Sequence, residues 1–152
     1  QSPFLKGHHG MAPAHRDDHT ETAIAVHEAI GLAATATHSA KETPHTIAAI
    51  YYPGVYFMDD EMDFYVDISG WHEQRIQAET LFSSQAQTEA LARKRVEIAA
   101  GHMGWVSGTE YAEGFVRAKP ELLPRITVAE SALKRAEEPR IKHIRRMSGE
   151  LK

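Results

Sequence analysis

The sequence predicts an α/β fold with a mainly parallel sheet. Short runs of β-favouring residues alternate along the chain with longer segments whose apolar residues repeat at the helical period. The chain has 152 residues, which is the length of one domain and enough to bury a core. Only two or three strands are evident, so we expect the sheet to be incomplete within this chain.

Composition narrows the class of protein. Apolar residues make up 42% of the chain and charged residues 25%, as in ordinary soluble globular proteins. A formal charge of −4 argues against nucleic-acid binding, which requires a basic face. Cysteine is absent, so any metal must be held by His, Asp or Glu. The sequence shows neither a signal-peptide pattern nor an apolar run of membrane-spanning length, and we expect a cytoplasmic protein without a membrane span.

The first third of the chain predicts a loop, a helix and a strand. Residues 1–18 are rich in Gly, Pro and His and are typical of a loop. Residues 20–37 are predicted to form a helix with an Ala-rich face suited to packing on a sheet. The apolar run at 46–52, ended by Pro53, predicts a buried strand.

The middle of the chain repeats the alternation of strand and helix. The acidic segment is predicted to be a solvated turn, and Ser69 is placed to cap the helix that follows the next strand. The predicted elements are the acidic turn at 58–63, a strand at 64–68, helices at 70–83 and 87–102, and a strand at 111–116. We expect Trp71 and Trp105 to lie in the core or in a pocket wall.

The C-terminal end predicts two helical segments. Thr127 and Glu130 match a capping box, so a helix should begin near Val128 and break at Pro139. Residues 140–152 are basic and amphipathic, with an apolar stripe formed by Ile141, Ile144 and Met147. We expect this last segment to dock at an oligomer or domain contact.

Imidazoles and carboxylates are concentrated just before the first predicted helix. His15, Asp17, Asp18 and His19 are suitable metal ligands, in a loop entering a helix, where α/β folds place ligands. A catalytic zinc takes three such ligands and activates a water at its open position. The competing interpretation is a solvent-exposed loop. The pair His27–Glu28 lacks a second His four residues after the first, so we expect it to lie on the helix surface.

Five short segments follow one another in an order that resembles a known family, the PIG-L/LmbE-like zinc-dependent deacetylases. The resemblance is to the C-terminal half of these enzymes and covers residues 8–118. The segments are Asp18-His19-Thr20-Glu21-Thr22 before an Ala-rich helix, Ile50-Tyr51-Tyr52-Pro53, Asp63-Phe64-Tyr65-Val66-Asp67-Ile68-Ser69, Ser84-Gln85, and Tyr111-Ala112-Glu113-Gly114-Phe115.

The resemblance implies a Rossmann-like three-layer sandwich, of which this chain would be the C-terminal part. Residues 1–126 would belong to the deacetylase domain, and 127–152 would form a helical extension. The implied activity is zinc-dependent removal of an acetyl group from an amino-sugar conjugate or a similar amide. The implied cofactor is Zn²⁺, and the implied substrate is a small molecule of the amino-sugar type.

The family motif also implies roles for individual residues. In the family, a His-Pro-Asp-His segment supplies the third zinc ligand through its last His, which corresponds to His19. The first His faces the tetrahedral intermediate, which assigns that role to His15. The segment here is one residue longer than the motif and lacks its Pro. Asp18 and Asp67 are candidates for supporting carboxylates that orient a neighbouring group, or for helix caps.

The Ala-His-Pro-Asp-Asp motif that supplies the family's other two ligands and its base has no counterpart here. The chain also begins with Gln1 and not Met. We therefore expect the N-terminal half of the site to come from the same precursor or from a second chain, and we expect a homo-oligomer. Two alternatives stay open, namely a metal-dependent hydratase on the same fold and a non-catalytic fragment acting as an interaction domain.

Overall fold

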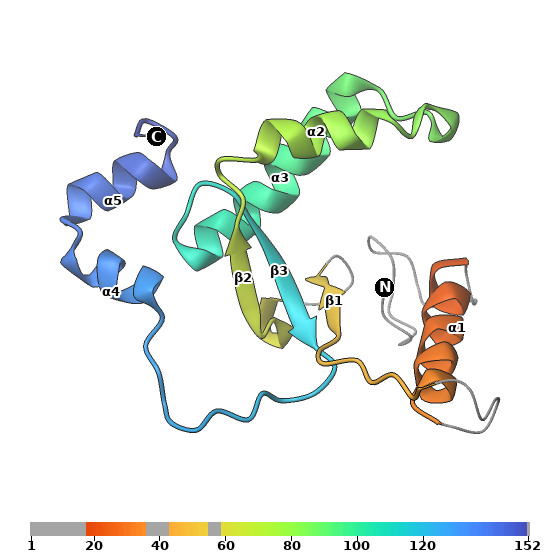
Figure 1. The fold of residues 1–152 in the computed structure, drawn as a ribbon. Helices are drawn as coiled ribbons and strands as arrows, with labels where there is room; N and C mark the ends of the chain where they lie inside the picture. The colour runs from red at the N-terminus through yellow and green to blue at the C-terminus, as the bar shows by residue number, and fades with distance from the viewer. Residues whose placement is uncertain (1–17, 36–42, 55–58, 152) are drawn as a thin grey trace. The chain divides into compact units, whose positions relative to one another are not determined.

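The computed structural model describes residues 18–35, 43–54 and 59–151, and its ribbon is drawn in Figure 1. The chain divides into two compact units. Unit 1 consists of Gln1–Asp63 and Phe115–Pro120, and unit 2 of Phe64–Gly114 and Glu121–Lys152. Each unit therefore contains two separate pieces of the chain.

Helix α1 (Asp18–Ala33) confirms the first predicted helix, although it ends earlier than expected. Its buried residues are Thr20 and Ala23, and the next inward position is His27, whose Nε2 lies 2.8 Å from the hydroxyl of Tyr52. Burial raises the pKa of that tyrosine. His27 is therefore half-buried, and its predicted position on the helix surface is wrong. The predicted Ala-rich packing face is also wrong, because three of its alanines are exposed: Ala25, Ala29 and Ala33.

Strand β1 (Tyr51–Pro53) is much shorter than predicted, since residues 43–50 form neither helix nor strand. It pairs antiparallel with β3 (Ala112–Arg117), with Tyr52 opposite Val116. The acidic turn contains the 3-10 helix η2 (Asp59–Glu61). It is tied to β3 because the Asp63 carboxylate accepts a hydrogen bond of 2.6 Å from the backbone N–H of Arg117.

Unit 2 is built on a pair of helices that follow strand β2 (Phe64–Asp67). They are α2 (His72–Thr80) and α3 (Glu89–Ser107), joined through the 3-10 helix η3 (Ser83–Gln85). These elements confirm the predicted order of strand, helix and helix. Four buried side chains form their shared core: Ile76, Ala92, Val96 and Ala100.

Local sequence explains where α3 begins and ends. The hydroxyl of Thr88 accepts a hydrogen bond of 3.2 Å from the backbone N–H of Leu91, which caps the first turn. Gly108 ends the helix in the left-handed conformation, with φ of 78°, which glycine adopts without steric cost. By contrast, α2 begins after Trp71 without a side-chain cap, so the predicted capping role of Ser69 is wrong.

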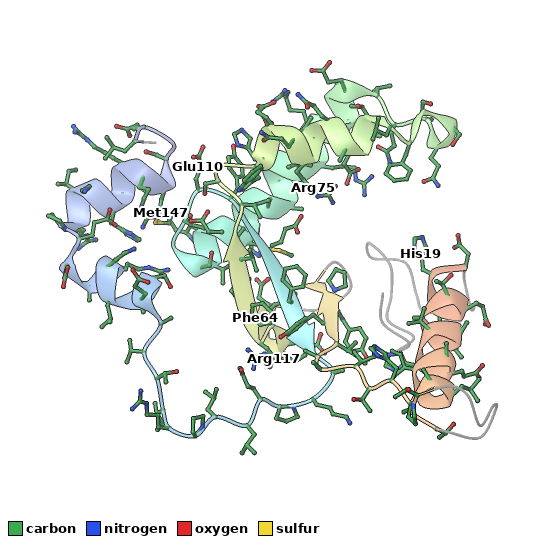
Figure 2. The ribbon with its side chains drawn as sticks, viewed as in Figure 1. His19, Phe64, Arg75, Glu110, Arg117 and Met147 are labelled. Carbon is green, nitrogen blue, oxygen red and sulfur yellow. The ribbon has the colours of Figure 1, made fainter. Side chains whose placement is uncertain are left out.

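Ion pairs cross between α2 and α3. Arg93 binds both carboxylate oxygens of Glu73, at 2.8 and 2.9 Å. The carboxylate of Glu79, only 12% exposed, lies between Arg75 and Arg95 at 2.8 and 3.2 Å; Figure 2 labels Arg75 on α2. Partly exposed pairs of this kind contribute modestly to stability, but their geometry fixes how the two helices align.

The predicted fold class, a Rossmann-like sandwich with a mainly parallel sheet, is wrong. The sheet has three strands in the order β1-β3-β2. Asp63 N–H donates to the Phe115 carbonyl and Ile68 N–H to the Tyr111 carbonyl, so β2 and β3 also run in opposite directions.

The direction of β3 follows from the path of the two helices before it. A parallel pair needs a crossover that returns the chain to the starting end of the first strand. Here α2 leads away from the end of β2 and α3 runs back to that same end, as Figure 1 shows. The Ser69 and Thr109 hydroxyls, at the two ends of this excursion, lie 3.1 Å apart. The next strand must therefore run antiparallel to β2.

The C-terminal segment contains α4 (Glu130–Glu137) and α5 (Arg140–Met147), separated at Pro139 as predicted. The predicted capping box is wrong, because α4 starts after Ala129 without a side-chain cap. Arg135 donates to the Ser107 carbonyl at 2.7 Å, which ties the segment to the end of α3. The boundary at residue 126 stays a prediction. Across the described ranges, we find no helix with the length and apolar character needed to cross a membrane.

Candidate functional site

His19, the predicted zinc ligand, is the second residue of α1 and is labelled in Figure 2. Its side chain is 45% exposed, and its Nε2 lies 3.8 Å from Oδ1 of Asp18, whose side chain is 91% exposed. A carboxylate in the first helical turn is favourable because the N-terminus carries partial positive charge. His15 lies outside the described residues, so its assignment stays a prediction.

These donors do not form a complete metal site on their own. A catalytic zinc needs about three protein ligands. The described part of the chain contains no group of three or more His, Asp or Glu side chains that could hold a metal ion. His19 and Asp18 supply an imidazole and a carboxylate from one helical turn, and any further ligands must come from elsewhere.

Asp67 belongs to unit 2 and lies in a different environment, at the end of β2. Its Oδ1 accepts hydrogen bonds from the backbone N–H of Ser69 at 2.9 Å and from the Ser69 hydroxyl at 2.6 Å. The Ser69 hydroxyl also lies 3.1 Å from that of Thr109 and accepts a 3.1 Å hydrogen bond from the backbone N–H of Tyr111. Asp67 therefore holds together the turn after β2 and the turn before β3.

The environment of Asp67 favours its ionised form. Partial burial alone would raise the pKa of this carboxyl group, but the Ser69 side chain and backbone, Thr109 and the charge of Arg146 together lower it below its ordinary value. A carboxylate committed to these donors is better suited to positioning two turns than to binding a metal.

The variant Asp67→Asn is expected to lower the free energy of unfolding by about 1 kcal/mol at pH 7, the scale of a charge-assisted hydrogen bond discounted for solvent exposure. A lowered pKa stabilises the folded state above the unfolded-state value of about 3.9, and this contribution disappears as the pH falls through the lower folded-state pKa. Urea unfolding from pH 7 to 2.5 should therefore show the two proteins converging in acid. Asp60→Asn, in the exposed acidic turn, is the control; an Asp67→Asn deficit that persists in acid would contradict this explanation.

Sequence reasoning missed Thr109 and Arg146 as parts of this cluster. Thr109 is only 5% exposed and follows the glycine that ends α3, a position with no distinctive sequence signal. Arg146 lies in α5, where it donates to the Gly108 carbonyl at 3.3 Å and to Glu138 at 3.1 Å. The sequence predicted the basic helix that carries Arg146, but not that this side chain binds the turn after α3.

Aromatic groups surround the same turn. The His72 ring stacks on Tyr111, with centroids 4.6 Å apart and an interplanar angle of 18°. Its Nδ1 lies 3.0 Å from the Ser69 carbonyl oxygen. The tryptophans behave differently: Trp71 is 67% and Trp105 75% exposed, so their predicted place in the core is wrong.

Comparisons of the chain with protein-family models, curated proteins and solved structures gave no match. The resemblance to the deacetylases thus rests on the order of the five short segments alone. Among the residues of those segments, the structure brings Asp67, Ser69 and Tyr111 together in unit 2 and places His19 beside Asp18 in unit 1.

Proposed function

We propose that this chain forms part of a zinc-dependent hydrolase that removes an acetyl group from an amino-sugar conjugate or a similar small amide. The observation that carries the proposal is the half-exposed imidazole of His19 at the start of α1, within the segment order that resembles the deacetylases. When bound, zinc would supply an activated water and polarise the amide carbonyl. The chain itself contributes His19, with His15 as the second candidate.

The remaining ligands and the general base are proposed to lie in residues outside this chain. Within residues 18–35, 43–54 and 59–151, one imidazole beside one carboxylate falls short of the three-ligand shell of a catalytic zinc. Asp67 is assigned a positioning role, because its carboxylate is already bonded to Ser69.

The variant His19→Ala tests this proposal. We expect the protein, purified with the polypeptides that accompany it, to hold about one zinc per chain. We expect His19→Ala to lose most of that zinc and to lower acetate release at least a hundredfold, because a metal ligand cannot be replaced by a methyl group. Metal analysis and an assay on N-acetylated amino sugars measure the two effects.

His45→Ala is the matched control, since His45 is an exposed histidine in the same unit. It should keep both zinc and activity. A wild-type preparation without zinc, or a His19→Ala variant with full zinc, would exclude the assignment. Water addition to unsaturated acids in place of acetate release would identify the hydratase.

A non-catalytic interaction domain is the second candidate. It is favoured by a specific observation, namely the solvent-exposed apolar residues Ile141 and Ile144 on α5. An intact-mass measurement of the preparation distinguishes the two candidates: the hydrolase requires a polypeptide that carries the remaining ligands, and the interaction domain does not.

A further inference from the structure

Helix α5 presents its polar side inward and its apolar side outward. His143 and Arg146 face the rest of unit 2. They contact Glu138 at 3.3 and 3.1 Å, and Arg146 also donates to the Gly108 carbonyl. Ile141 and Ile144 lie on the opposite side and are 63% and 47% exposed. A short helix with this reversed orientation leaves an apolar stripe in water, which is typical of a contact surface.

The outward side of α5 is also strongly basic. Together with Ile141 and Ile144, it carries Lys142 and Arg145, which we call the α5 outer face. Four basic residues and no acidic residue occur within Arg140–Met147. A partner for this face must therefore combine apolar groups with negative charge.

Among the helices in the described ranges, α1 carries such a face and has no Lys or Arg to oppose it. Helix α1 buries Thr20 and Ala23, and on its opposite side Val26 and Leu32 are 51% and 54% exposed. Glu28 is exposed one helical turn before Leu32, and we call Val26, Glu28, Ala29 and Leu32 the α1 outer face. Helix α1 contains acidic residues at 18, 21 and 28 and neither Lys nor Arg.

We propose that the α5 outer face binds the α1 outer face of a second copy of this chain. Both faces are helical and apolar at their centre, and their charges are opposite, as in complementary protein interfaces. Burial of Ile141 and Ile144 against Val26 and Leu32 would supply the apolar contact. Lys142 and Arg145 opposite Glu28 would set its specificity. The inference does not depend on the proposed hydrolase activity.

Sedimentation of the 152-residue chain over a range of concentrations tests the proposal. The wild type should form dimers or larger assemblies, and the double variant Ile141→Glu/Ile144→Glu should raise the dissociation constant at least tenfold. The matched control is Leu122→Glu/Ile126→Glu, which changes two exposed apolar residues outside both faces and should leave the dissociation constant unchanged.

Charge reversal identifies the partner face. Glu28→Lys and Lys142→Glu should each weaken self-association about tenfold, because each places like charges opposite one another. An equimolar mixture of these two variants should recover most of the lost affinity, since a mixed pair again places opposite charges at positions 28 and 142 in both of its contacts.

Three results would overturn the proposal. The first is a wild-type chain that stays monomeric at every concentration. Pairing of the two faces within one chain would give this result, and it too contradicts the proposal. The second is a mixture of charge variants that associates no better than either variant alone. The third is an α5 double variant that keeps its oligomeric state and loses binding to vesicles of anionic lipid, which would make a membrane the partner of α5.

Discussion

Replacing Ile76 with alanine is expected to lower the free energy of unfolding of unit 2 by about 2–5 kcal/mol. Ile76 is 1% exposed and is the largest fully buried side chain among the described residues. Its neighbours in the core are Ala92, Val96 and Ala100. The substitution leaves a cavity beside these residues. Two of them are alanines, whose methyl groups have no alternative rotamer that could fill it, so we expect a loss in the upper half of that range.

Urea unfolding followed by circular dichroism measures this loss. Ile98→Ala provides the control, since Ile98 lies on the same helix pair but is 62% exposed. The control should change the free energy of unfolding by less than about 0.5 kcal/mol, as exposed substitutions usually do. Equal effects of the two variants would show that α2 does not pack on α3 through Ile76.

Gly104→Ala is expected to destabilise unit 2 by about 1–3 kcal/mol because of overpacking. A Cβ atom at this position would contact the Glu110 carbonyl oxygen, lie 2.7 Å from the Glu110 carbonyl carbon and lie 2.9 Å from the Tyr111 nitrogen. These are backbone atoms, which cannot rotate away as a side chain could. The close approach of α3 to the chain entering β3 thus requires glycine.

Gly101 offers a control within the same helix, one turn away. A Cβ atom there would meet only Cε1 of Tyr111 at 3.8 Å, an ordinary contact. Gly101→Ala should therefore stabilise unit 2 by about 0.5–1 kcal/mol through helix propensity. Thermal unfolding of both variants is the measurement, and a Gly104→Ala variant as stable as Gly101→Ala would disprove the close approach.

Most helices and strands could be predicted because their signals are local. The apolar repeat in α3 and the breaks at Gly108 and Pro139 depend on neighbouring residues only. The direction of β3 depends on a property of the whole excursion, the path of the two helices between paired strands. The number of helices was available in the sequence, but the packing of α3 against α2, which returns the chain to the end of β2, was not.

Faces and side-chain partners were harder to predict than elements. The alanines of α1 were assigned to the packing face, but His27 lies inward because Tyr52, 25 residues away, provides a hydroxyl for its ring. Ser69 has the composition of a helix cap, but its hydroxyl is bound to Asp67 and to groups 40 and 42 residues away. Such partners are fixed by tertiary structure, and spacing along the chain does not reveal them.

In the candidate site too, local features were predictable and tertiary contacts were not. The position of His19 at the start of a helix followed from local sequence, and the structure agrees. The network around Asp67 was only partly visible, because Thr109 and Arg146 are brought to it by the return of α3 and by the position of α5. A linear motif can therefore suggest the first residue of a cluster but not its surroundings.

The division of β3 between the two units has a consequence for protein synthesis. Residues 64–114 are contiguous and include the paired helices, so this part of unit 2 can fold as soon as it leaves the ribosome. The N-terminal piece of unit 1 emerges earlier, but it must wait for Phe115–Pro120, which are made only after that whole excursion. We therefore expect the usual order of folding from the N-terminus to be reversed in this chain.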